Sequence, residues 1–199
     1  MDRECMNVVY ASNDGYARHL GTSLYSLLDR NRDFAEISVY VLTLGLSEEN
    51  QGKLREIAEH FGRRLIFLNL DDLLERIGYE VDTGGFDISV MLRLFMGDML
   101  PESVERVLYL DCDTVVLQSL KHLWKEELEG KIVGAVMEPT IYQAVKESID
   151  LSEDDPYYNS GVLLVDLKQW REQEIQKKLL EFWKSKGGKL FASDQDVIN

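Results

Sequence analysis

Two aspartates separated by a single residue, Asp111 and Asp113, have the types and spacing that most clearly suggest chemistry in this sequence. They follow an apolar run at residues 107–110, which has the character of a buried strand. In extended backbone residues i and i+2 point to the same side, so both carboxylates can aim at one point. A hard divalent cation, Mg²⁺ or Mn²⁺, would relieve their repulsion and take substrate phosphates as further ligands. On local sequence alone, turn or N-cap residues after a strand are an equally weighted alternative.

The composition limits the classes of partner. The 199 residues are 45% hydrophobic and 29% charged, as in globular proteins with a substantial core. A net charge of -14 and a pI near 4.6 argue against nucleic acid, and a phosphorylated ligand would need a metal ion to reverse the local field. Cys5 and Cys112 form no disulfide framework, and residues 1–5 hold no signal-peptide run. We therefore expect a cytoplasmic protein with no transmembrane segment.

Strands and helices alternate in the first third of the chain. Apolar runs at residues 6–11, 37–42 and 64–68 have the length of strands, and residues 20–28 and 47–61 repeat apolar positions at helical spacing. This order predicts an α/β fold with a mainly parallel central sheet flanked by crossover helices. Ligands of such sheets bind beyond the carboxyl ends of the strands, so Asn13 and Asp111 should face one crevice.

The remaining chain predicts further elements. We expect a helix at residues 89–100 that carries Arg93, strands at residues 107–110 and 131–136, and one long amphipathic helix at residues 167–183. Residues 159–161 read as a polar tip that leads into an apolar strand. Taken alone, Arg93 is more simply a structural ion-pair partner than an anion contact, and residues 194–196 are more simply a helix N-cap.

Four segments together resemble glycosyltransferase family 8, the group of glycogenins and bacterial lipopolysaccharide galactosyl- and glucosyltransferases. They are residues 8–16 (VVYASNDGY), 107–113 (VLYLDCD), 158–164 (YNSGVLL) and 194–196 (DQD). Each motif is weak alone, but their order and spacing match over nearly the whole chain. The resemblance implies a GT-A fold, which is a Rossmann-like nucleotide-sugar-binding fold. It also implies a Mn²⁺ or Mg²⁺ ion and retaining transfer of glucose or galactose from a UDP-sugar to a saccharide or glycolipid acceptor, as in lipopolysaccharide biosynthesis.

The resemblance also implies roles for individual residues. Asp113 would bind the metal most directly, and Asp111 would contact both the metal and the donor. The positions that it assigns to the donor are Ala11, Asn13, Tyr16, Arg93, Asp111, Asn159 and Ser160. Asp194 and Gln195 would be the catalytic residues, with Asp194 on the donor-sugar hydroxyls and Gln195 on the back face of the anomeric carbon. Because a neutral amide is a poor nucleophile, we favour charge stabilisation by Gln195 with front-face attack.

Several positions depart from the family pattern. Asn13 stands where the base-reading residue is often Asp, Gly15 stands where Asn is common, and Met91 stands where an aromatic is usual. Asparagine offers a donor and an acceptor, so it can still pair with a pyrimidine edge. These differences bear on the base and the sugar rather than on the fold. The acceptor side is expected near Glu138 and residues 141–142.

Three other functions fit parts of the sequence. Asp111 could be the nucleophile of a haloacid-dehalogenase-type phosphatase, but that family places its motif on the first strand, whereas about half of this chain precedes Asp111. A sugar-1-phosphate nucleotidyltransferase would need a glycine-rich, arginine-containing first loop, which residues 12–16 do not resemble. A non-catalytic nucleotide-sugar-binding protein is the third alternative.

The last residues of the sequence suggest a longer protein. An apolar-periodic element begins near Asp194 and has no stop signal before Asn199. The family resemblance adds a metal-binding histidine and a diphosphate-binding lysine farther on, and His19, His60 and His122 lie in predicted helices that do not match that place. We therefore expect residues 1–199 to be a single GT-A domain truncated at its C-terminal end. Peripheral membrane association through residues after Asn199 stays open.

Overall fold

The computed structural model describes residues 5–199, so most of the N-terminal stretch that we judged unlike a signal peptide lies outside the described residues. The described residues form a six-stranded sheet in the order β3-β2-β1-β4-β6-β5. Its strands are β1 (Cys5–Asn13), β2 (Glu36–Leu44), β3 (Arg64–Asn69), β4 (Arg106–Leu110), β5 (Val133–Met137) and β6 (Tyr158–Asp166). β1 pairs in parallel with β2 and β4, β2 pairs in parallel with β3, and β6 runs antiparallel to β4 and β5. The expected mainly parallel α/β sheet is confirmed.

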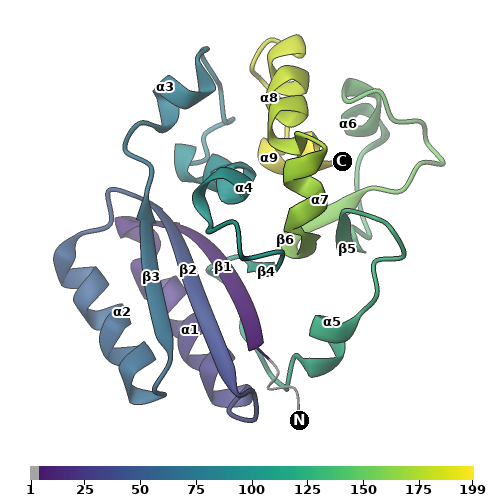
Figure 1. Cartoon of the computed structure of the whole chain (residues 1–199). Helices are drawn as coiled ribbons and strands as arrows, with labels where there is room; N and C mark the ends of the chain where they lie inside the picture. The colour runs from purple at the N-terminus through teal and green to yellow at the C-terminus, as the bar shows by residue number, and fades with distance from the viewer. Residues whose placement is uncertain (1–4) are drawn as a thin grey trace.

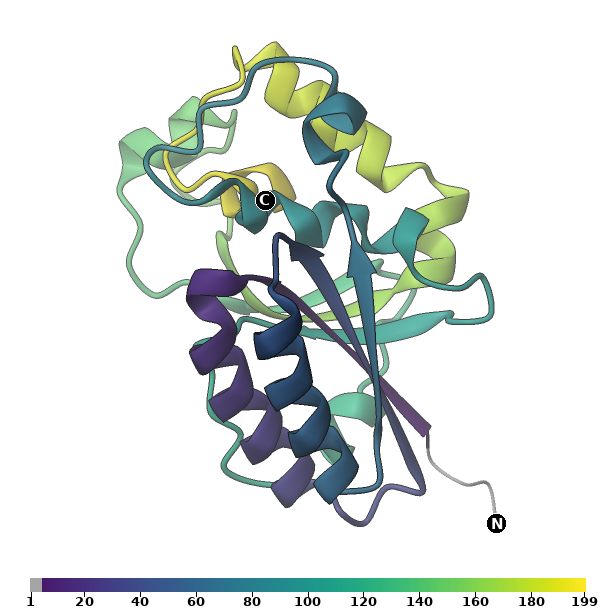
Figure 2. The ribbon, with the colours of Figure 1, turned by 90° about the vertical axis from the view of Figure 1, so that its left-hand side faces the viewer.

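Helices cover both faces of the sheet (Figure 1). α1 (Ala17–Arg30) and α2 (Glu48–His60) lie side by side on one face, as Figure 2 shows. Val8 and Tyr10 of β1 pack in the cluster that contains the α1 leucines, whereas Val9 packs in the cluster on the opposite face. Successive strand residues point to opposite faces, so an almost continuous apolar run serves both cores.

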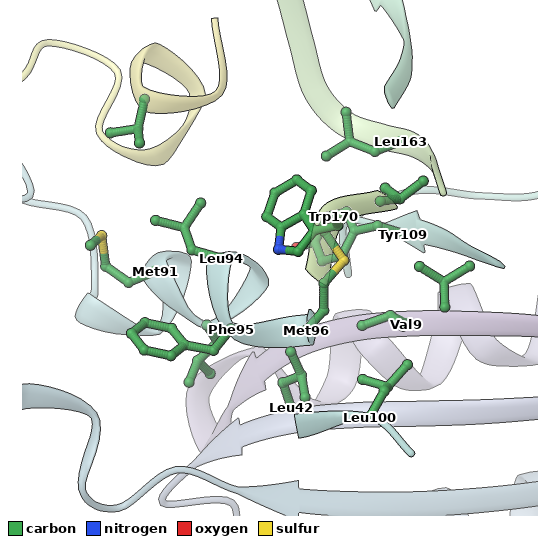
Figure 3. Close-up of a cluster of buried hydrophobic side chains, with 14 of the residues drawn as sticks. Val9, Leu42, Met91, Leu94, Phe95, Met96, Leu100, Tyr109, Leu163 and Trp170 are labelled. Carbon is green, nitrogen blue, oxygen red and sulfur yellow. The ribbon is translucent and has the colours of Figure 1, made fainter. Parts of the chain in front are cut away.

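The second face is covered by elements from the later part of the chain. They are the 3₁₀ helix η2 (Ile88–Phe95), α4 (Met96–Met99), α7 (Leu167–Glu172), α8 (Ile175–Ser185) and α9 (Asp194–Ile198). Leu94, Met96, Trp170, Val9 and Leu42 belong to one buried cluster, in which Figure 3 shows Met96 between Trp170 and the side chains of Val9 and Leu42. Shorter elements complete the chain: η1 (Asp14–Tyr16), α3 (Leu73–Ile77), α5 (Lys121–Lys125) and α6 (Gln143–Ser148). Among residues 5–199, no helix is both long and apolar enough to span a bilayer.

Two predicted helices differ from the structure. The helix expected at residues 89–100 is mostly 3₁₀, because η2 precedes only a short α4. Six of the eight η2 residues are buried, so no apolar stripe reveals the helical period in the sequence. The helix expected at residues 167–183 is broken at Glu174, which has a left-handed φ of 51°. On one continuous helix Trp170 and Trp183 would point about 140° apart, and the break lets both enter the same core.

Arg171 anchors the link that joins η2 and α4 to β4. Its guanidinium donates to the carbonyl oxygens of Gly97 (2.8 Å), Leu100 (2.9 Å) and Val104 (2.9 Å), with two longer bonds to residues between them. Arg93 precedes this link and Asp111 follows it, so the anchor sets the spacing between two predicted site residues. One planar fork of five N–H donors suits such a set of carbonyls, and a lysine could not satisfy it.

We expect Arg171→Ala to lower the free energy of unfolding by about 3 kcal/mol, because several partly buried carbonyls lose charged donors. Urea denaturation of the variant measures this loss. Arg30→Ala is the matched control, since its guanidinium is exposed and meets Asp29 at 3.7 Å. The control should cost less than about 0.5 kcal/mol. Equal losses in the two variants would show that Arg171 does not hold the link.

Candidate functional site

A cavity of about 320 Å³ opens at the carboxyl ends of β1 and β4. Its wall includes residues from β1, η2, β6, α9 and the turn after β4. Eight of the ten predicted site residues line it: Ala11, Tyr16, Arg93, Asp111, Asp113, Ser160, Asp194 and Gln195. Asn13 and Asn159 are not among the lining residues in the described structure, although Asn13 is hydrogen-bonded to Tyr16 and Ser89, which are. Asp111 and Asp113 line the cavity, whereas Asn13, which we expected to face the same crevice as Asp111, contributes only through its hydrogen bonds to two wall residues.

The backbone that carries the two aspartates differs from the predicted extended conformation. β4 ends at Leu110, and the Thr114 N–H and Oγ1 donate to the Asp111 carbonyl at 3.2 and 2.7 Å, which closes a turn. The extended backbone assumed for Asp111 and Asp113 is therefore wrong, and the turn alternative describes the local structure. Both aspartates still line the cavity, because the turn forms part of its wall. A turn and a ligand site are compatible here.

Arg93 is the centre of the polar network in this cavity. Its side chain is buried, and its guanidinium lies 2.9 Å from Asp111 Oδ1 and 2.7 Å from Asp194 Oδ2. Nη1 also donates to the Ser160 carbonyl at 2.7 Å and to its hydroxyl at 3.1 Å. The Tyr109 ring lies 4.5 Å from the guanidinium carbon. Arg93 is thus the ion-pair partner expected from the sequence alone, and it also faces the cavity.

Burial controls the protonation of the acidic wall. Asp194 is 5% exposed, and desolvation raises its pKa to about 6 even though the Arg93 charge opposes the shift. The charge of Asp111 pushes the Asp194 pKa in the same direction as burial. Cys112 stands between the two motif aspartates in the sequence. Burial raises the pKa of its thiol to about 12, and the thiol donates a hydrogen bond to the Ala11 carbonyl. Cys112 therefore stays protonated and acts as packing.

Asn13 shapes one end of the cavity. Its Oδ1 accepts from the Tyr16 N–H at 3.0 Å, which caps η1, and its Nδ2 donates to Ser89 Oγ at 3.2 Å. Tyr16 stays half exposed with its ring on the cavity wall. The Asp87 carboxylate, which the sequence reasoning missed, lines the same end and accepts from the Ser89 N–H at 2.9 Å. An aspartate two residues before a serine at a helix start was the available signal.

The residues 159–161 are part of β6 rather than a tip before it. A register shift between Ala135 and Val136 of β5 accommodates them. Asn159 Oδ1 accepts from the Gly161 N–H at 2.8 Å, and its Nδ2 donates to Glu138 at 3.1 Å. A Cβ at residue 161 would lie 2.8 Å from Asp111 Oδ2, so only glycine allows this close approach of β6. The missing side chain leaves room for the Asp111 carboxylate.

The pH dependence of stability should identify the buried carboxyl of Asp194. Its pKa in the folded protein is about 6, above the ordinary 3.8, so the folded state binds the proton more tightly than the unfolded chain. The free energy of unfolding of the wild type minus that of Asp194→Asn should therefore fall by about 2 kcal/mol between pH 4 and pH 7. Chemical denaturation across this range measures it.

Asp72→Asn is the control for that experiment. Arg76 holds the pKa of the exposed Asp72 below its ordinary value, so the corresponding difference should rise rather than fall at the acid end of the range. If the difference in unfolding free energy between the wild type and Asp194→Asn does not change with pH, the Asp194 carboxyl has the same pKa in the folded protein as in the unfolded chain.

Comparisons with known proteins agree with this geometry. A family model described as "Glycosyl transferase family 8" matches residues 7–199. General stress protein A of Bacillus subtilis (strain 168) is 30% identical over 199 residues, covering 98% of this chain and 68% of that protein. The lipopolysaccharide 1,2-glucosyltransferase of Escherichia coli (strain K12) is 28% identical over 98% of this chain, which spans 58% of the relative's length.

The fold has a close counterpart among solved structures. The galactosyltransferase LgtC, crystallised with donor and acceptor sugar analogues, superposes with a TM-score of 0.86 and 28% identity over 98% of this chain and 69% of its own. The expected GT-A fold is therefore confirmed. With the family model matched over nearly all of the residues, the chain belongs to glycosyltransferase family 8.

Proposed function

We propose that this chain carries a retaining, metal-dependent hexosyltransferase activity. It transfers glucose or galactose from a UDP-sugar to a saccharide or glycolipid acceptor of the lipopolysaccharide type. The observation that carries the proposal is the convergence of Arg93, Asp111, Asp194 and Gln195 on one cavity at the carboxyl edge of the sheet. Family membership and the sugar transferases among its relatives support the same reaction.

Asp111 and Asp113 are suited to a divalent cation. Asp111 Oδ1 is engaged by Arg93 and by the Tyr109 hydroxyl, while Oδ2 faces the space left by Gly161. Asp113 is exposed and lines the cavity mouth. Within residues 5–199 no cluster of three or more His, Cys, Asp or Glu side chains forms a metal site, so phosphate oxygens and water would complete the shell. When bound, Mn²⁺ or Mg²⁺ would stabilise the charge that develops on the departing diphosphate.

Asp194 is suited to a hydroxyl of the donor sugar. Its Oδ2 forms the ion pair with Arg93 but accepts no well-aligned hydrogen bond from the described residues. A buried carboxylate oxygen without such a bond is costly, and a ligand hydroxyl can supply the bond. Ser160 presents its hydroxyl beside Arg93, in reach of the same sugar. Gln195 also lines the cavity and would stabilise positive charge at the anomeric carbon.

The base of the donor would occupy the end of the cavity near Tyr16. The half-exposed Tyr16 ring offers a stacking face beside Ala11, and Asn13 and Asp87 supply an amide and a carboxylate near it. Glu138 and the exposed Tyr142 mark the side from which we propose that the acceptor approaches. A cytoplasmic location remains part of this proposal.

The phosphatase alternative fits the structure poorly. Asp111 follows β4, the fourth strand in chain order, and its carboxylate is held by a buried arginine. A nucleophilic carboxylate bound in this way would lose much of its reactivity through the charge of Arg93. The family match also argues against a nucleotidyltransferase. The sugar transferases among the relatives also favour an enzyme over a nucleotide-sugar-binding protein without activity.

Replacing Asp113 with Asn should abolish Mn²⁺-dependent binding of UDP, because the cation loses an anionic oxygen ligand. Isothermal titration calorimetry with and without Mn²⁺ measures the binding, and circular dichroism checks the fold. Asp154→Asn makes the same change in charge on an exposed loop and should bind UDP as the wild type does. Unchanged UDP affinity of Asp113→Asn in Mn²⁺ would rule out its metal role.

The reaction itself is tested with UDP-glucose, UDP-galactose and p-nitrophenyl phosphate, each with and without Mn²⁺. We expect slow release of UDP that requires the metal ion and favours one of the two sugars. Hydrolysis of the phosphate ester would instead indicate a phosphatase. Binding of UDP-sugar with no UDP release, even with saccharide acceptors present, would indicate a binding protein.

A further inference from the structure

Two buried polar side chains lie behind Gln195, and the proposed function gives neither of them a role. Tyr157, which directly precedes β6, is 1% exposed, and Asp196 of α9 is fully buried. The Tyr157 hydroxyl donates to Asp196 Oδ1 at 2.5 Å, and the Ala192 N–H donates to Asp196 Oδ2 at 2.7 Å. Both oxygens of the buried carboxylate therefore accept a hydrogen bond, as burial of a charge requires.

The Tyr157 proton is committed to Asp196. Burial, and then the hydrogen bond to Asp196, raises the pKa of the Tyr157 hydroxyl well above its usual range, so the hydroxyl keeps its single proton. That proton points at Asp196, which leaves only the lone pairs of the hydroxyl oxygen for other contacts. Gln195 Nε2 lies 3.4 Å from this oxygen and donates to it.

The other end of the Gln195 amide meets a group of opposite polarity. Its Oε1 accepts from the Ser160 N–H at 3.0 Å. Turning the amide over would place its carbonyl against a hydroxyl oxygen and its NH₂ against an N–H, which loses both bonds. Ser160 lines the cavity, whereas Tyr157 is buried behind it. The carbonyl end of Gln195 is consequently held on the cavity side.

We propose that Tyr157 is a positioning residue, which with Asp196 fixes the Gln195 amide so that its carbonyl oxygen faces the anomeric carbon of the donor. The inference rests on the proposed function, in which Gln195 stabilises positive charge. The amide can stabilise positive charge only when its carbonyl oxygen faces the anomeric carbon, because the NH₂ group is the positive end of the amide dipole. The tyrosine and the carboxylate select that orientation before the donor binds.

Tyr157→Phe removes the hydroxyl and keeps the ring that fills the core. We expect kcat for UDP release from the sugar donor to fall roughly 10- to 100-fold, as when a catalytic group is misplaced. The KM for the donor and the Kd for UDP with Mn²⁺ should change less than about twofold, because the binding residues are untouched. Tyr79→Phe is the matched control. The Tyr79 hydroxyl donates to the Leu180 carbonyl at 2.7 Å, and Tyr79 does not line the cavity. The kcat of this control should stay at the wild-type value.

A double-mutant cycle tests whether Tyr157 acts through Gln195. In the Gln195→Ala background, Tyr157→Phe should cause no further loss in kcat, because there is no amide left to orient. Full additivity of the two losses would overturn the inference and assign Tyr157 a separate, structural effect. If Gln195→Ala alone leaves kcat unchanged, the proposed role of Gln195 fails instead. If Gln195→Ala is slow and Tyr157→Phe is not, only the positioning role fails.

Asp196→Asn provides a second variant in case Tyr157→Phe does not fold. The new amide has almost the shape of the carboxylate, and its oxygen would face the Ala192 N–H. Its NH₂ would then donate to Tyr157, which frees the hydroxyl proton to point at Gln195 and favours the inverted amide. We expect the same fall in kcat with near-normal UDP affinity. Wild-type kcat in a folded Asp196→Asn protein would overturn the proposal.

Discussion

The structure of the site depends on one buried positive charge. A guanidinium that leaves water is costly unless it is paired and hydrogen-bonded, and Arg93 meets this requirement with two carboxylates, one carbonyl and one hydroxyl. Those partners come from the turn after β4, from β6 and from α9, so the burial of Arg93 fixes three segments relative to η2. Two carboxylates around one cation leave a negative excess. The raised pKa of Asp194 reflects burial together with this excess, and a divalent cation or a proton can balance the charge.

Several features outside the cavity serve this charge network. Arg171 fixes the link between the segment that carries Arg93 and the strand that leads to Asp111. Gly161 lets β6 approach the Asp111 carboxylate more closely than any other residue would allow. The two cores on opposite faces of the sheet hold the strands rigidly beneath the site. A rigid scaffold of this kind keeps the polar groups in place before a donor arrives, which is what electrostatic stabilisation needs.

The sequence carries enough information for the sheet and for most of the wall of the cavity, since strand runs, helical periodicity and short polar motifs are local patterns. Asp111, Asp194 and Gln195 stand out for this reason. The prediction of extended backbone at Asp111 is wrong because a turn and the end of a strand look alike in sequence. No proline or glycine marks the break between α7 and α8 at Glu174. The burial of Trp170 and Trp183 in the same core explains the break. Tyr157 was missed because its hydrogen-bond partners, Gln195 and Asp196, are distant in the sequence. Asp87 was missed because its local capping pattern does not reveal that it lines the cavity.

The ion pair between Arg93 and Asp194 joins residues that are 101 positions apart in the chain (194 − 93). At ribosomal speeds of roughly 5 to 20 residues per second, the arginine emerges about 5 to 20 s before its partner. Until then, Arg93 stays hydrated, since burying it with one carboxylate fewer would be costly. The first three strands and their two helices can pair during this interval through contacts of short range, whereas the cavity closes only when α9 docks. During synthesis the pocket of this protein thus forms after its sheet, and a nascent chain stalled before residue 194 would have a sheet but no pocket.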